Sequence, residues 1–208
     1  MSRWRVLVVA AVAVPVVALV ALVVVVLAAD DTEEGLLAGT PVAAQPAVDL
    51  TLADPDGRPV SLRALRGQVV VLTFLYTSCP DVCPLTADLL AAADRELGDR
   101  AADVRYVIVS VDPERDTPEA RRIFLARHRL PAARSHYLSG PAGELARLWR
   151  AHGVSRAPDE PHAHDEGGEV THTDVLFLID ADGDEREVVR SDVDRADLVH
   201  DLRVLLDS

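Results

Sequence analysis

The chain has 208 residues, with 34 acidic residues against 21 basic ones and a formal net charge of −13. So acidic a protein would be repelled by phosphate, which argues against binding to nucleic acid. With two tryptophans, three tyrosines and three phenylalanines, the core must be built largely from Val, Leu and Ala, and the length is sufficient for such a core without disulfide staples.

An uncharged run of 24 residues extends from Val6 to Ala29, with arginines before it and acidic residues after it. About 20 apolar residues cross a bilayer, whereas the apolar part of a secretory signal is about 7 to 15 residues long. We therefore expect residues 1–29 to form an N-terminal transmembrane anchor or signal-anchor, although Val26-Leu27-Ala28 would also pass as a cleavage site. The arginines before the run predict a single-pass cell-membrane protein with its N-terminus in the cytoplasm and its functional domain outside.

Small residues and prolines without periodicity predict a flexible linker over residues 30–47, followed by one extracytoplasmic domain over residues 48–208. Apolar alternation and buried runs predict strands at 48–52, 59–62, 69–75, 104–111, 136–139, 174–180 and 185–190. Helical patterns predict helices that follow the cysteines to about residue 97 and that cover 118–128, 143–151 and 195–206. This order is typical of an α/β, thioredoxin-like domain with an N-terminal β-hairpin extension.

The only two cysteines, Cys79 and Cys83, lie in Thr-Ser-Cys-Pro-Asp-Val-Cys-Pro, between a predicted buried strand and a predicted helix. A helix N-terminus favours thiolate over thiol, and Pro84 suits the first helical position, which would place Cys83 near the N-cap. Two chemistries follow: reversible disulfide exchange, or two sulfur donors to a soft metal such as Cu(I) or Zn(II). A purely structural disulfide is disfavoured because it would close only a short loop.

Among the seven histidines, His172 differs from the others because it comes immediately before the strong strand 174–180. A thioredoxin-like fold brings that point of the chain alongside the cysteine turn. Thioredoxin-like reductases carry a proline there. A histidine beside two thiolates makes a three-coordinate soft-metal site. Four further histidines are interpreted as surface or packing residues: His128, His136, His152 and His200.

Four segments of the chain together match one known family: Asp54 to Leu65 with Gly67 and Val69 to Phe74; Cys79, Cys83 and Pro84; Val109 to Pro118; and His172 with Phe177 to Asp180. On these segments the chain resembles the SCO/SenC family, the membrane-anchored copper proteins that assist the assembly of cytochrome c oxidase. The first segment is shared with peroxiredoxins and membrane-tethered reductases, whereas the combination of four segments is specific. Gln68 departs from the family, which usually has a lysine there.

The resemblance implies copper ligation by Cys79, Cys83 and His172 in a protein that binds Cu(I) and Cu(II). It implies a metallochaperone that serves the dinuclear copper centre of cytochrome c oxidase subunit II, either by delivering copper or by reducing thiols. The expected partners are subunit II, a thiol reductant, an upstream copper donor and the membrane. Zinc is the runner-up metal, although a structural zinc site normally has four ligands.

The alternative function is an extracytoplasmic thiol-disulfide oxidoreductase, with Cys79 attacking a partner disulfide and Cys83 resolving it. Redox thioredoxins place two residues between their cysteines, whereas this chain places three. A peroxidase is a weaker rival, because Tyr76 stands where peroxiredoxins want threonine. A copper- or redox-responsive sensor is a third class.

A histidine-containing loop and one aspartate each have two possible interpretations. His162 and His164 lie in a polar loop and either capture copper transiently or belong to a flexible surface loop. Asp112 ends a predicted central strand; its carboxylate either orients a metal ligand through a hydrogen bond or fixes the loop together with Arg115 and Asp116.

Overall fold

A six-stranded sheet forms the centre of the structure, a computed structural model that describes residues 37–154 and 174–208. Its spatial order is β1-β8-β7-β4-β5-β6. The central strands β4, β5 and β6 are parallel, whereas β7 is antiparallel to β4 and β1 closes one edge antiparallel to β8. The strands are β1 (Thr40–Pro46), β4 (Val69–Leu75), β5 (Val104–Ser110), β6 (Ser135–Leu138), β7 (Val175–Ile179) and β8 (Asp184–Arg190).

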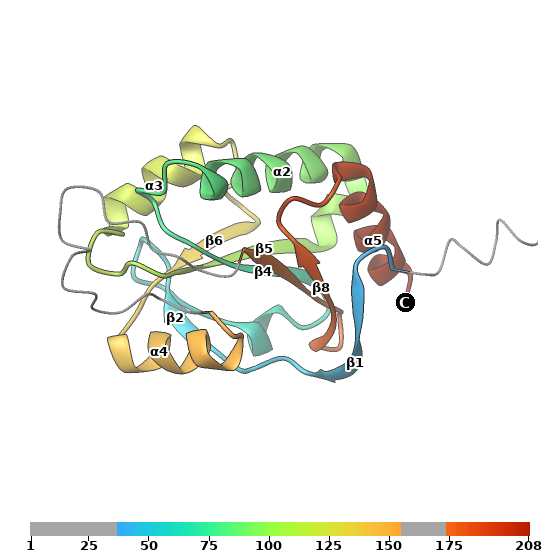
Figure 1. Cartoon of the computed structure of the whole chain (residues 1–208), viewed down its shortest axis with the longest axis horizontal. Coiled ribbons are helices and arrows are strands. Elements are labelled where there is room, and N and C mark those ends of the chain that lie inside the picture. Colours follow the sequence, from blue (N-terminus) through green and yellow to red (C-terminus); the bar gives the residue numbers. More distant parts are fainter. Residues whose placement is uncertain (1–36, 155–173) are drawn as a thin grey trace, which may run out of the picture. The chain divides into compact units, whose positions relative to one another are not determined.

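Helices cover both faces of the sheet (Figure 1). Because connections between parallel strands are right-handed, the path from β4 through β5 to β6 places α2 and α3 on the same face. Helix α5 packs against α2, and α4 lies on the opposite face together with a small hairpin. The helices are α2 (Val82–Leu97), α3 (Pro118–Arg127), α4 (Ala142–Ala151) and α5 (Arg195–Asp207), with 3-10 turns η1 (Leu62–Leu65) and η2 (Gly98–Asp103).

The core is centred on β4, all of whose residues are buried, as expected for a strand covered on both faces. On the α4 side, Phe74 of β4 and Phe177 of β7 meet edge to face, with ring centroids 6.1 Å apart. The ring of His152, at the end of α4, lies against both of them, and its Nδ1 is 2.9 Å from the Leu148 carbonyl oxygen. His152 is therefore a packing residue of the core, as the sequence predicted.

The predicted order of strands and helices from residue 48 onward is confirmed. The N-terminal hairpin consists of β2 (Thr51–Ala53) and β3 (Pro59–Ser61), and it forms a separate two-stranded sheet. A backbone bridge attaches it to the main sheet, because Ala53 and Ser139 exchange N–H···O bonds of 2.9 and 3.0 Å. The hairpin thus lies beside β6.

The flexible linker predicted over 30–47 is wrong for residues 40–46, which form strand β1. This strand pairs with β8 in a register that runs from Thr40 opposite Val188 to Pro46 opposite Asp184. Most of its residues are exposed, so no apolar alternation marks it in the sequence. Pro41 and Pro46 are tolerated because β1 is an edge strand, where a missing N–H costs no ladder bond.

Residues 1–29, for which a membrane anchor is predicted, lie outside the described residues. Within the described ranges, none of the helices has both the length and the apolar character needed to cross a bilayer.

The start of α3 follows the predicted capping pattern. The Thr117 side-chain oxygen accepts a hydrogen bond of 3.2 Å from the Ala120 N–H, and Pro118 takes the first helical position. We expect Thr117→Ala to lower the free energy of unfolding by about 1 kcal/mol, because the helix loses its side-chain cap. Urea unfolding measures this loss, with Thr117→Ser as the control that retains the hydroxyl. Equal midpoints for the Ala and Ser variants would contradict the capping role.

Candidate metal and thiol site

The cysteine turn connects the carboxyl end of β4 to α2, beside the carboxyl end of β5. The Cys79 N–H donates to the Tyr76 carbonyl oxygen at 3.3 Å, and the Cys83 N–H donates to the Cys79 Sγ at 3.4 Å. Both cysteines lie in the described part of the chain and are separate thiols rather than a disulfide. Cys79 is 8% exposed and Cys83 is completely buried, so Cys79 is the thiol that solvent and partners can reach.

Two expectations about the start of α2 are corrected. The helix begins at Val82, so Pro84 is its third residue rather than its first, although a missing N–H there still costs no helical bond. The predicted lowering of cysteine pKa does not hold for Cys83. Burial, then the hydrogen bond with the neighbouring Cys79 thiol, raises the pKa of Cys83 well above its ordinary value, and the Asp174 charge adds to the rise. Burial outweighs the helix N-terminus because the Cys83 side chain points into the core.

A buried carboxylate holds the residue two positions before Cys79. Oδ1 of Asp116 accepts hydrogen bonds from the Thr77 N–H at 2.7 Å and from the Thr77 hydroxyl at 2.6 Å. Oδ2 accepts from the Ser110 hydroxyl at 2.5 Å and from the Tyr137 hydroxyl at 3.3 Å. One side chain therefore links the cysteine turn to the ends of β5 and β6.

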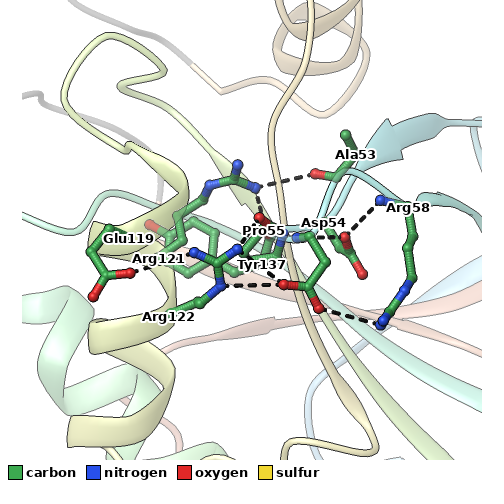
Figure 2. Close-up of polar contacts among 9 residues, drawn as sticks. Ala53, Asp54, Pro55, Arg58, Glu119, Arg121, Arg122 and Tyr137 are labelled. Atoms are coloured by element: carbon green, nitrogen blue, oxygen red, sulfur yellow. Dashed lines mark hydrogen bonds and ion pairs between the residues drawn. The ribbon is translucent and has the colours of Figure 1, made fainter.

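Arg121 of α3 fixes this arrangement from the side of the hairpin, and Figure 2 shows its contacts with Ala53 and Tyr137. Its Nε donates to the Asp116 carbonyl oxygen at 3.2 Å, and its Nη1 donates to the carbonyl oxygens of Ala53 and Tyr137 at 3.1 and 2.7 Å. Arg121 is 4% exposed, and burial lowers the pKa of its guanidinium. A single buried cation therefore joins α3, the hairpin and β6.

Asp112 is buried just beyond the end of β5. Its N–H donates to the Ser110 hydroxyl, its carbonyl oxygen accepts from the N–H groups of Arg115 and Asp116, and its carboxylate pairs with Arg115 at 3.5 Å. These contacts favour the loop-fixing interpretation. Orientation of a metal ligand by Asp112 stays a prediction, since His172 lies outside the described residues.

The antiparallel strand β7 begins beside the carboxyl end of β4, which carries the cysteine turn, and runs away from it. The Thr73 hydroxyl of β4 donates to the Val175 carbonyl oxygen at 3.0 Å, and Asp174 is close enough to Cys83 to influence its pKa. His162, His164 and His172 lie outside the described residues. Within 37–154 and 174–208, no three His, Cys, Asp or Glu side chains are arranged to hold a metal ion, and only Cys79 and Cys83 of the predicted ligand set are described.

Sequence reasoning missed the roles of Asp116 and Arg121. Asp116 was considered only as a loop residue beside Asp112, because it stands just before an obvious helix start. The sequence did contain a feature that pointed to Asp116. It is the last acid of Asp-Pro-Glu-Arg-Asp-Thr-Pro, which follows a strand parallel to the one that leads into the cysteines. Carboxyl ends of parallel strands meet at one edge of a sheet, where functional residues gather.

Comparison with known proteins connects this geometry to a family. The SCO1/SenC family model matches residues 40–207. The chain belongs to the SCO1/SenC family. A Stutzerimonas stutzeri protein named for copper binding is 33% identical over 164 residues, which are 76% of each chain.

Solved SCO structures share the fold. The apo Sco1 protein of Thermus thermophilus is 30% identical with a TM-score of 0.70, over 82% of this chain and 98% of that one. ScoI of Bradyrhizobium japonicum, solved with copper bound, is 27% identical with a TM-score of 0.65, over 77% of this chain and 99% of that one. These likenesses confirm the α/β, thioredoxin-like fold predicted for this SCO1/SenC domain.

Proposed function

We propose that this protein binds copper through Cys79, Cys83 and His172 and assists the assembly of the dinuclear copper centre of cytochrome c oxidase subunit II. One observation carries the proposal: two separate thiols are held together at a strand-to-helix turn, with the Cys83 N–H on the Cys79 sulfur. Thiolate sulfur is the donor that Cu(I) prefers. Copper in ScoI of Bradyrhizobium japonicum, a family member 27% identical to this chain, supports the choice of metal.

The position of β7 supports His172 as the third ligand. His172 stands three residues before Val175, which is held against β4 by the hydrogen bond from Thr73. Three residues reach at most about 11 Å, and this short length of chain is compatible with the proposed ligand role of His172. We further propose that residues 1–29 anchor this domain on the outer side of the cell membrane, where a reductant must keep the thiols reduced.

The test is an anaerobic Cu(I) competition titration of the reduced full chain, comparing wild type with Cys83→Ser and His172→Ala. Removing a residue that only holds a metal ligand in place typically lowers metal affinity roughly 10–100-fold. Removing a ligand itself should lower the Cu(I) affinity by more than this. His200→Ala, on α5, is the matched histidine control and should bind as wild type does. Stoichiometric, tight binding that both variants weaken would support copper delivery. Binding that ignores His172 would contradict the three-ligand site.

The difference in exposure between the two cysteines favours thiol-disulfide exchange as a second candidate function. Cys79, the more exposed thiol, would attack a partner disulfide, and Cys83 would then displace the reduced partner from the mixed disulfide. The partner gains two thiols and this chain gains the Cys79–Cys83 disulfide, which the thiol reductant reduces. Reduction of protein disulfides by a chain that binds no Cu(I) would favour this function over copper delivery.

A further inference from the structure

The carboxylate of Asp116 is the most completely bonded side chain near the site. It is 2% exposed, and each of its oxygens accepts two hydrogen bonds. Both donors on Oδ1 belong to Thr77, one from the backbone and one from the side chain. This double contact fixes the backbone of Thr77 and also its side-chain rotamer.

Holding a loop with the buried carboxylate of Asp116 has a free-energy cost. Taking a charged group out of water costs free energy unless hydrogen bonds compensate, and burial raises the pKa of Asp116 although Ser110 and Thr77 oppose the rise. Well-packed apolar residues often replace buried charges without loss of stability. The arrangement at Asp116 therefore points to a requirement for geometry rather than for stability alone.

The constraint on Thr77 is passed to Cys79 over a very short length of chain. Only two planar peptide units separate the two residues, and the Cys79 N–H is itself bonded to the Tyr76 carbonyl oxygen. The sulfur of Cys79 in turn receives the Cys83 N–H. On the other side, Arg121 holds the Asp116 backbone carbonyl, so the carboxylate cannot follow a displaced loop.

We propose that Asp116 is a positioning residue that sets the direction of the Cys79 thiol by holding Thr77. This inference rests on the proposed function, because the thiol that it positions is one of the proposed copper ligands. Asp116 acts through Thr77 and contacts no metal itself.

Two variants test the proposal in the reduced full chain. Asp116→Asn keeps the shape of the side chain but places an amide where an oxygen accepts hydrogen bonds. Thr77→Val removes the hydroxyl and leaves the backbone N–H in place. We expect each to weaken Cu(I) affinity about tenfold, the lower end of the effect of outer-shell residues on metal sites. The double variant should lose little more than either single one, because both changes break the same link.

Asp94→Asn is the matched control for a purely structural role. Asp94 is also a buried acid, paired with Arg134 at 2.7 Å near the far end of α2, so its loss lowers stability without touching the cysteine turn. We expect it to bind Cu(I) as wild type does. If affinity falls in all three single variants in step with their unfolding midpoints, or in none of them, the proposal is overturned.

A copper-independent measurement separates this proposal from the proposed function. The rate at which iodoacetamide alkylates Cys79 should rise several-fold in Asp116→Asn and in Thr77→Val, because a released turn exposes the thiol, and it should stay at the wild-type value in Asp94→Asn. If wild type binds no Cu(I), the proposed copper function is wrong, and the alkylation rates alone test whether Asp116 positions the Cys79 thiol. Unchanged rates would overturn it. If Asp116→Asn does not fold, Thr77→Val supplies the decision.

Discussion

Replacement of Arg121 by methionine is expected to lower the free energy of unfolding by about 3–5 kcal/mol, the range measured when one partner of a buried charged network is removed. The guanidinium donates to three carbonyl oxygens, those of Ala53, Asp116 and Tyr137. Methionine fills a similar volume but offers no donor, so these carbonyls lose their side-chain partner. The Asp116 carboxylate also loses a neighbouring cation, whose pKa its negative charge raises against the effect of burial.

The next residue along α3 provides a matched control. Arg122 is exposed, and it pairs with Asp56 at 3.0 Å and with Glu119 at 3.4 Å. Figure 2 shows Arg122 and Glu119 beside Arg121. Exposed ion pairs contribute about 0–1 kcal/mol, so Arg122→Met should have a small effect. Urea unfolding of both variants at one pH measures the difference. Similar losses for the two arginines would mean that the buried cation does not hold the hairpin to α3 and β6.

The second large effect concerns a buried pair of acids far from the cysteines. Glu187 of β8 and Asp201 of α5 are both completely buried. Burial, followed by repulsion from Asp201, raises the pKa of Glu187 to about 7, and burial also raises the pKa of Asp201. In the unfolded chain the Glu187 carboxyl titrates near 4.5. Between these values the folded protein binds more protons than the unfolded one.

The sign of the effect follows from this difference in bound protons. Stability falls as pH rises from about 4.5 to about 7, and above pH 7 the stabilising contribution of the protonated Glu187 carboxyl is lost. We expect Glu187→Gln to be more stable than wild type at pH 8 by about 2–3 kcal/mol, with the difference shrinking towards pH 4.5. Urea unfolding across this pH range measures it. Glu144→Gln, on exposed α4 surface, is the control, and a pH-independent difference for Glu187→Gln would refute the linkage.

Most of the fold could be predicted because its central strands are long apolar runs with clear ends. Every residue of β4 is buried, and the predicted boundaries of α3 agree with the Thr117 cap and the end at Arg127. Strand β1 could not be predicted, because an exposed edge strand with two prolines has no periodic pattern. Its partner β8 lies more than 130 residues away in the sequence, so only the folded sheet reveals the pairing.

The site was predictable in part. The two cysteines lie close together in the sequence, with three residues between them, and their place after a buried strand follows from the local pattern. The role of Asp116 depends on Thr77, Ser110 and Tyr137, which lie 39, 6 and 21 residues from it and meet only where β4, β5 and β6 end together. The pKa of Cys83 was predicted in the wrong direction because the sequence shows the helix start but not the depth of the side chain.

Strand β1 also determines where a soluble fragment of this protein can begin. The segment leading into β1 is tied to the domain by the Ala38 N–H, which donates to Oδ1 of Asp201 at 2.7 Å, and by Gly39, where an added Cβ would lie 2.3 Å from the Glu187 side chain. A fragment that starts at residue 48 would leave β8 as a bare edge, open to pairing with a second molecule. Expression fragments should therefore begin no later than Leu37, and shorter ones should aggregate however well their cysteine turn is formed.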